Sequence, residues 1–183
     1  GPHALPLAQQ VEKVWMEPDG EGERVPDTWE FTVPAPMDAA IELTGEMQGE
    51  LQLVGGDESV TGVASLLPGR GWKGELSAGR HLLKVVCSRR NNRQPYQVAV
   101  RPEQLVAGLT REVHAPASVP VSVGSDGLVE IASFGSADVR GRLLDADGHL
   151  VASSDDRAGD WNFSIQRRLA PGAYRLDVEP VGA

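Results

Sequence analysis

Hydrophobic and polar side chains alternate along most of this chain, in short runs. The run "TWEFTV" places Trp29, Phe31 and Val33 on one face and polar residues on the other. Similar runs cover residues 41–43, 51–53, 83–87, 96–100, 119–123, 129–131, 161–165 and 174–178. Period-two alternation bounded by Gly, Pro, Asn or Asp is typical of half-buried antiparallel strands. We therefore predict an all-β protein.

The segment "LPLAQQVEKVWM", residues 5–16, is the one place where a helix competes with a strand. Its apolar spacing is loose, and a strand through Leu7 to Val11 fits equally well, so we favour the strand.

The alternation also predicts which tryptophan side chains are buried. Trp29, Trp72 and Trp161 share faces with apolar neighbours, which predicts core or rim positions, whereas Trp15 is the best candidate for an exposed, ligand-stacking ring.

Two segments far apart in the chain resemble each other. "LSAGRHLLKV" (76–85) and "LAPGAYRLDV" (169–178) share Leu, Gly, Leu and Val at an offset of 93 residues. "IEL" (41–43) and "VEI" (129–131) match at an offset of 88, which implies about five inserted residues in the second half, near "FGSADVRGR". Because the matched pieces keep their order, we interpret the halves as two copies of one unit.

The shared motif has a structural interpretation. Gly79 and Gly172 allow a turn with positive φ, and the residues after them share one face of the next strand. His81 and Tyr174 occupy the same position, where we expect a satisfied core histidine and a boundary tyrosine whose hydroxyl reaches water or a carbonyl. The motif is thus predicted to be the hairpin that closes each sandwich.

The repeat suggests a division of the chain. The opening "GPH" resembles the scar of a protease-cleaved tag, so residues 1–4 are expected to be foreign. Residues 5–101 and 102–183 are expected to form two tandem antiparallel, jelly-roll-like β-sandwich domains, with the boundary near Pro102.

Composition narrows the function. No apolar run approaches the roughly 20 residues that span a bilayer, and the net charge of −9 argues against nucleic-acid binding. The one basic cluster, Arg89, Arg90 and Arg93, is expected to be a solvated hairpin loop, with contact to an acidic partner as the alternative. The single Cys87 continues an apolar face and is expected to point inward.

Acidic residues supply the one candidate metal site. Asp145, Asp147, Asp155 and Asp156 could offer oxygen ligands to Ca²⁺, although "DADG" and "SSDD" are also good turn and loop sequences. The chain has no GxSxG elbow and no HExxH motif, so we expect no enzymatic activity and no other cofactor.

The second half resembles the bacterial pre-peptidase C-terminal domain. That family shows a strand–turn–strand motif with an Asp-x-x-Gly turn and then an L-x-x-G-x-Y-x-[LV]-x-V finish. The matching positions here are Asp138, Leu143 or Leu144, Asp145, Gly148, Val151, Ser153 or Ser154, Leu169, Gly172, Tyr174, Leu176 and Val178. The first half departs from the pattern, because it lacks the Asp-x-x-Gly turn and has His81 in place of the tyrosine.

The resemblance implies a non-catalytic accessory module of a secreted or cell-envelope bacterial protein. Its expected role is contact with a protein partner or with a neighbouring domain of the same polypeptide. Carbohydrate or cell-wall binding, with calcium as a possible aid, is the alternative, because some relatives bind sugars or calcium. Exposed aromatic rings in a groove would favour the carbohydrate alternative.

Overall fold

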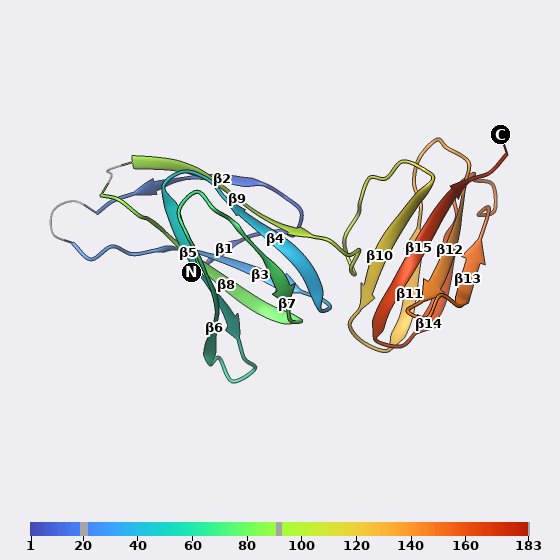
Figure 1. Cartoon of the computed structure of the whole chain (residues 1–183), viewed down its shortest axis with the longest axis horizontal. Helices are drawn as coiled ribbons and strands as arrows, with labels where there is room; N and C mark the ends of the chain where they lie inside the picture. Colours follow the sequence, from blue (N-terminus) through green and yellow to red (C-terminus); the bar gives the residue numbers. More distant parts are fainter. Residues whose placement is uncertain (19–21, 91–92, 183) are drawn as a thin grey trace. The chain divides into compact units, whose positions relative to one another are not determined.

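The computed structural model describes residues 1–18, 22–90 and 93–182, and within these ranges every regular element is a strand. All paired strands are antiparallel except one short parallel pair, so the all-β prediction is confirmed. None of the described residues forms a helix of the length and apolarity needed to cross a membrane. The chain divides into two compact units, Gly1–Glu103 (unit 1) and Gln104–Ala183 (unit 2), shown in Figure 1.

Unit 1 contains two sheets, with strand orders β1-β3-β8-β5-β6 and β2-β9-β4-β7. Trp29 of β3 donates a hydrogen bond to the Tyr96 hydroxyl of β9 at 3.0 Å, so the inner faces of these sheets meet. The strands are β1 (His3–Ala4), β2 (Val11–Met16), β3 (Asp27–Val33), β4 (Met37–Leu43), β5 (Met47–Val54), β6 (Val60–Leu66), β7 (Trp72–Leu76), β8 (Gly79–Cys87) and β9 (Arg93–Pro102).

Unit 2 also contains two sheets, with strand orders β10-β15-β12-β13 and β11-β14. Valine, leucine, isoleucine and phenylalanine side chains from both sheets form one buried cluster between them. The strands are β10 (Ala117–Val123), β11 (Gly127–Ala132), β12 (Val139–Asp145), β13 (Leu150–Ser154), β14 (Ser164–Leu169) and β15 (Gly172–Pro180).

The two units share one topology. The order β3-β8-β5-β6 in unit 1 corresponds to β10-β15-β12-β13 in unit 2, and the pair β4-β7 corresponds to β11-β14. Even an irregularity is shared, because the pairing with the next strand shifts after Leu51 in β5 and after Leu143 in β12. This agreement is what two copies of one unit predict, and unit 1 adds β1, β2 and β9 to it.

The alignment of the copies differs from the sequence prediction. Val33 pairs with Gly79, and Val123 pairs with Gly172, so the first strands correspond at an offset of 90 residues rather than 88. The inserted residues lie only partly where the sequence prediction placed them. Gly49 and Gly141 are equivalent at an offset of 92, so the connection between β11 and β12 holds two extra residues. Leu66 and Ser154 pair with these glycines, yet Leu66 lies ten residues before Leu76 and Ser154 lies 15 before Leu169, so five extra residues lie in the loop 155–163.

Most predicted inward faces are buried, and the exceptions have local causes. Leu83, Val85, Cys87 and His81 of β8 are all fully buried, as predicted. In β5 the register shift after Leu51 moves burial from the expected Leu53 to Val54. The predicted strand at residues 7–11 instead begins at Val11 and runs to Met16, because residues 7–8 form a turn.

Two expected hairpins are connections between sheets. The closing motif leaves β7, which pairs with β4, and enters β8, which pairs with β3 and β5. Gly79 and Gly172 have φ values of 129° and 150°, so the predicted positive φ is confirmed at both turns. The arginine segment likewise joins β8 of one sheet to β9 of the other, and thus is no hairpin loop.

Candidate binding surface

The exposure predicted for Trp15 and the burial predicted for Trp161 are both wrong. Trp15 is only 1% exposed, because β2 pairs with β9 and the Arg24 guanidinium lies 5.8 Å from the centre of its ring. Trp161 is 65% exposed, because β14 begins only at Ser164 and strand parity does not extend back to residue 161. Trp29 is buried and Trp72 half-buried, as predicted.

Trp161 lies where two loops of unit 2 come together. β11 pairs with β14 so that Ala132 faces Ser164, and β12 pairs with β13 so that Gly141 faces Ser154. The loop 133–138 leads from β11 to β12, and the loop 155–163 leads from β13 to β14. Both loops therefore pass between the two sheets at the same end of the unit.

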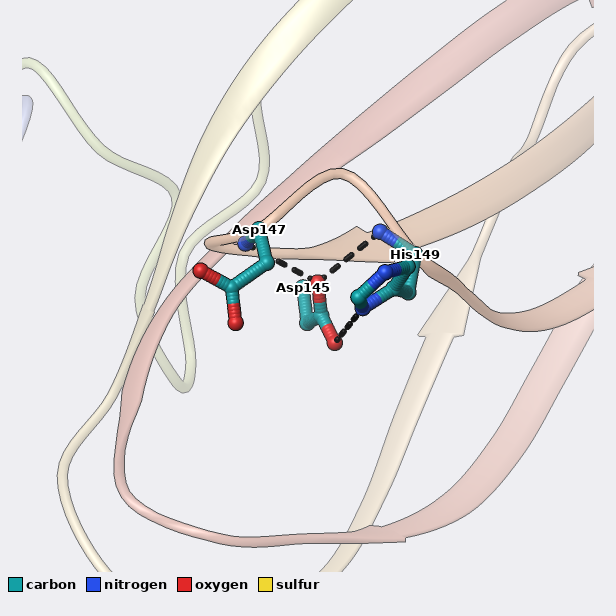
Figure 2. Close-up of side chains that lie close together, drawn as sticks. All are labelled: Asp145, Asp147 and His149. Atoms are coloured by element: carbon teal, nitrogen blue, oxygen red, sulfur yellow. Dashed lines mark hydrogen bonds and ion pairs between the residues drawn. The ribbon is translucent and has the colours of Figure 1, made fainter.

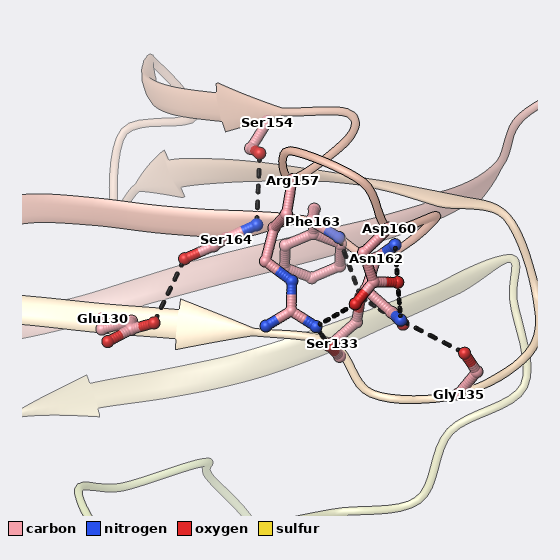
Figure 3. Close-up of polar contacts among 9 residues, drawn as sticks. All are labelled: Glu130, Ser133, Gly135, Ser154, Arg157, Asp160, Asn162, Phe163 and Ser164. Atoms are coloured by element: carbon pink, nitrogen blue, oxygen red, sulfur yellow. Dashed lines mark hydrogen bonds and ion pairs between the residues drawn. The ribbon is translucent and has the colours of Figure 1, made fainter.

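Polar contacts brace these loops against each other (Figure 3). The Phe163 amide donates to Ser133 Oγ at 3.0 Å, and the Ser133 amide donates back to the Phe163 carbonyl at 3.1 Å. Asn162, only 6% exposed, donates from Nδ2 to the Gly135 carbonyl at 3.2 Å and accepts from Ser133 Oγ at 3.2 Å. A buried amide with both ends bonded fixes the loop conformation.

Arg157 and Asp160 complete the brace. The Arg157 Nη2 donates to Asp160 Oδ2 at 2.9 Å and to the Ser133 carbonyl at 3.2 Å. Hydrogen bonds from Asn162, with help from the charge of Arg157, lower the pKa of the Asp160 carboxyl. The Asp160 carboxylate therefore stays ionised across the neutral range, and the Arg157 bond to the Ser133 carbonyl ties the loop 155–163 to the loop 133–138.

The braced loops present two exposed aromatic rings. Phe134 is 78% exposed, and the Arg157 guanidinium lies 5.1 Å from the centre of its ring. Trp161 is 65% exposed on the facing loop 155–163. The chain has only three Phe, two Tyr and four Trp, so two of its largest rings are concentrated on one loop pair. Such exposed aromatic surface is typical of recognition sites. We call Phe134 and Trp161 the aromatic platform.

Three carboxylates belong to the same two loops as the platform. Oxygen atoms of Asp138, Asp155 and Asp156 lie within 4.8 Å of one another. Asp138 immediately precedes Val139, whose amide donates to the Trp161 carbonyl at 3.4 Å. Partial burial, and then the charges of Asp156 and Asp155, raise the pKa of Asp138. A cation bound here would relieve that repulsion.

The other acidic group begins at Asp145, the last residue of β12, and Figure 2 shows its three side chains. Oxygen or nitrogen atoms of Asp145, Asp147 and His149 also lie within 4.8 Å of one another. Asp145 Oδ1, however, accepts the amides of Asp147 at 3.0 Å and His149 at 2.9 Å, and the His149 amide is the main cause that lowers the pKa of Asp145. This is the turn chemistry that the sequence offered as the alternative to calcium.

The four candidate calcium ligands thus form two separate groups. Asp145 and Asp147 lie in the β12–β13 turn, whereas Asp155 and Asp156 lie beside Asp138 at the other end of the same strand. A strand of seven residues separates its ends by about 20 Å. One ion therefore cannot be shared by all four.

The basic cluster is only partly described. Arg89 and Arg90 are exposed, and Arg89 pairs with Glu46 at 3.5 Å, while Arg93 begins β9. Residues 91–92, which lie between them, fall outside the described residues. Glu46 already supplies a local acidic partner for Arg89.

Sequence reasoning missed Phe134 and the joint position of the two loops. The available signal was the break in alternation at "FGSAD" and "DDRAGD", which marks two loops. The first of these segments begins with Phe134, and the second is followed by Trp161. A scan against protein-family models finds no match to this chain, and no curated protein is significantly similar to it.

Proposed function

We propose that this chain is a non-catalytic binding module made of two repeated, jelly-roll-like β-sandwich domains. It serves as an accessory part of a bacterial secreted or cell-envelope protein and contacts a protein partner or a neighbouring domain. The motif resemblance to pre-peptidase C-terminal domains supports the cellular setting. The exposed aromatic platform carries the binding role, because Phe134 and Trp161 are solvent-exposed on loops that buried Asn162 fixes in place.

A rigid, exposed aromatic surface favours binding over a merely structural role. Burying large rings on association supplies hydrophobic free energy, and a preformed loop loses little conformational entropy when a partner binds. In unit 1 the corresponding connection, between β6 and β7, has only five residues (67–71) against the nine of the loop 155–163. The binding role is therefore assigned to unit 2.

Affinity capture tests the proposal. The immobilised chain is incubated with envelope and secreted fractions of the source cells, and bound proteins are quantified by mass spectrometry. At least one protein should be retained by the native chain and reduced about tenfold or more by Phe134→Ala with Trp161→Ala. Leu128→Ala, which trims a 75% exposed side chain at the far end of β11, is the matched control and should retain the partner. Equal capture by all three proteins would contradict the proposal.

Carbohydrate binding is the second candidate, and the exposure of Trp161 favours it. A flat indole ring can stack on the apolar face of a sugar. A glycan array probed with the native chain should then show binding that Trp161→Ala abolishes and Leu128→Ala preserves. Array signals that survive Trp161→Ala would eliminate the platform as a sugar site.

Calcium remains a proposal for the carboxylates of Asp138, Asp155 and Asp156. Asp138 Oδ1 is buried and has no hydrogen-bond partner among the described residues, so it could accept an ion. Thermal unfolding should then shift upward with Ca²⁺ relative to EDTA, and the shift should vanish in Asp155→Asn with Asp156→Asn. An unfolding temperature that does not respond to Ca²⁺ or EDTA would rule the ion out.

A further inference from the structure

We infer that the aromatic platform of unit 2 recognises a basic peptide segment, in which a lysine or arginine stacks on Trp161 beside the carboxylates of Asp138, Asp155 and Asp156. This inference rests on the proposed binding function and adds the chemistry of the partner. It follows from three observations: Trp161 has no cation on its ring among the described residues, three carboxylates lie on the same two loops, and Phe134 is exposed for apolar contact.

Trp161 is the exposed ring that is still available to a cation. Among the described residues two cation–π pairs occur, Arg24 over Trp15 and Arg157 over Phe134. The platform therefore already packs a guanidinium on one of its two rings. Trp binds cations more strongly than Phe or Tyr, and such contacts strengthen when the cation is partly removed from water.

The carboxylates on the two loops that carry the platform complement a basic ligand, and their oxygen atoms lie within 4.8 Å of one another. Asp138 has a raised pKa through burial and through the charges of Asp156 and Asp155, so the three carboxyl groups repel one another. The nearby arginines compensate these carboxylates only in part, since Arg157 pairs with Asp160 at 2.9 Å, and Arg140 pairs with Glu179 at 2.8 Å while its charge also acts on Asp155. The net charge of −9 adds long-range attraction for a cationic partner.

Apolar side chains of the same segment fit the rest of the platform. Phe134 is 78% exposed and offers the ring face opposite Arg157. A peptide that alternates basic and apolar residues would place cations on Trp161 and the carboxylates while its apolar residues cover Phe134. An acidic or neutral segment would not relieve the repulsion among the three carboxylates.

Fluorescence titration of the full chain in EDTA tests the inference. The probe is a short labelled peptide that alternates lysine with leucine, and the reference is the same peptide with glutamate for lysine. We expect saturable binding of the basic peptide, accompanied by a shift in tryptophan emission, and no binding of the acidic one. Trp161→Ala should weaken binding about tenfold or more, and Asp155→Asn with Asp156→Asn about fivefold.

Two controls separate the platform from general charge attraction. Leu128→Ala keeps the whole charge pattern and the platform, so it should bind like the native chain. Trp161→Ala also keeps every charge, so undiminished binding by this variant would show that only bulk attraction acts and would overturn the inference. Because residue 161 is exposed in a loop, circular dichroism should show that this variant keeps the native fold.

The outcomes also distinguish this inference from the proposed function. Binding of chito- or cello-oligosaccharides through Trp161, without binding of the basic peptide, would overturn the inference in favour of a sugar ligand. Capture of a protein partner that requires the platform, combined with no affinity for the basic peptide, would overturn the inference and leave the proposed function intact.

Discussion

Tyr96 joins the two sheets of unit 1 through its hydroxyl group. The hydroxyl accepts a hydrogen bond from Trp29 Nε1 at 3.0 Å and donates one to Asp27 Oδ2 at 2.8 Å. Lys13 pairs with the other oxygen of Asp27. Burial, and then the hydrogen bond to Asp27, raise the pKa of Tyr96 far above the physiological range, so the hydroxyl keeps its proton and remains a donor.

Tyr96→Phe should therefore destabilise unit 1 by about 1–3 kcal/mol, because a buried indole N–H loses its acceptor and Asp27 loses a donor. Tyr174→Phe is the matched control. The Tyr174 hydroxyl makes one exposed bond, to the Ala170 carbonyl at 2.8 Å, so its loss should cost under about 1 kcal/mol. Urea unfolding measures both values, and equal losses would show that the Tyr96 network adds nothing to stability.

His81 is fully buried and lies parallel to Phe31, with ring centroids 5.2 Å apart. Its Nδ1 lies 3.1 Å from the Gly79 carbonyl, and its Nε2 has no partner among the described residues. Desolvation lowers the pKa of His81, and the contact with the Gly79 carbonyl only partly opposes this. The imidazole is thus neutral in the folded protein at neutral pH.

The sign of the pH dependence follows. In the unfolded chain His81 takes up a proton near pH 6.5, whereas the folded pKa is lower. The contribution of His81 to the free energy of unfolding is fully present above about pH 6.5. It falls as the pH drops from there toward the folded pKa, by at most about 1.4 kcal/mol per pH unit. His81→Phe should make the midpoint of urea unfolding depend less on pH between neutral and mildly acidic conditions. A slope unchanged by this substitution would contradict the assignment.

At the scale of elements, Gly141 of β12 explains how Phe163 enters the core. A Cβ at position 141 would lie 2.7–2.8 Å from three atoms of the Phe163 ring. The ring is 1% exposed and belongs to the buried cluster, so it has little room to move. The absence of a side chain at Gly141 therefore leaves the space beside β12 that the Phe163 ring occupies.

Gly141→Ala should destabilise unit 2 by about 1–3 kcal/mol through overpacking. Gly127→Ala is the matched control in β11, where an added Cβ meets nothing within 4 Å and φ is not positive. The control should leave the unfolding midpoint unchanged or slightly raised. Thermal unfolding followed by circular dichroism measures both, and a neutral Gly141→Ala would mean that Phe163 can shift at little cost.

The strands were predictable from the sequence because alternate side chains of a strand are buried, which leaves an alternating hydrophobic pattern in the sequence. The faces Trp29–Phe31–Val33 and Leu83–Val85–Cys87 could be derived from alternation alone. Parity failed where the ladder shifts, at Leu53, and where a strand begins later than its pattern, at Trp161. The candidate surface was therefore missed, because loops that meet in space are related by strand pairing and not by chain order.

A further signal of the repeat lies in the paired strands β5 and β6 and their counterparts β12 and β13. Gly49-Glu50-Leu51 and Gly141-Arg142-Leu143 occupy equivalent positions, and so do Val63–Ser65 and Val151–Ser153. The glycine–leucine spacing reflects the close packing beside β5 and β12. These matches lie at offsets of 92 and 88, because the β11–β12 connection is two residues longer than the β4–β5 connection and the β5–β6 hairpin is then four residues longer than the β12–β13 hairpin. A single fixed offset could not find them.

At the scale of the whole molecule, each unit contains its own sheets. Among the described strands, β1 to β9 pair only with one another, and so do β10 to β15. Leu51 and Leu143 occupy the same position in the two units, and both are fully buried. Because no backbone ladder connects the cores, we predict that the units unfold independently.

Leu51→Ala and Leu143→Ala test this prediction reciprocally. Each substitution leaves a cavity and should cost its own unit about 2–5 kcal/mol. Hydrogen exchange followed by mass spectrometry at rising denaturant reads the two units from separate peptides. Leu51→Ala should lower the midpoint of residues 1–103 only, and Leu143→Ala that of residues 104–183 only. If either variant lowered both midpoints equally, the copies would form one cooperative unit, and the aromatic platform would then depend on the stability of unit 1 as well.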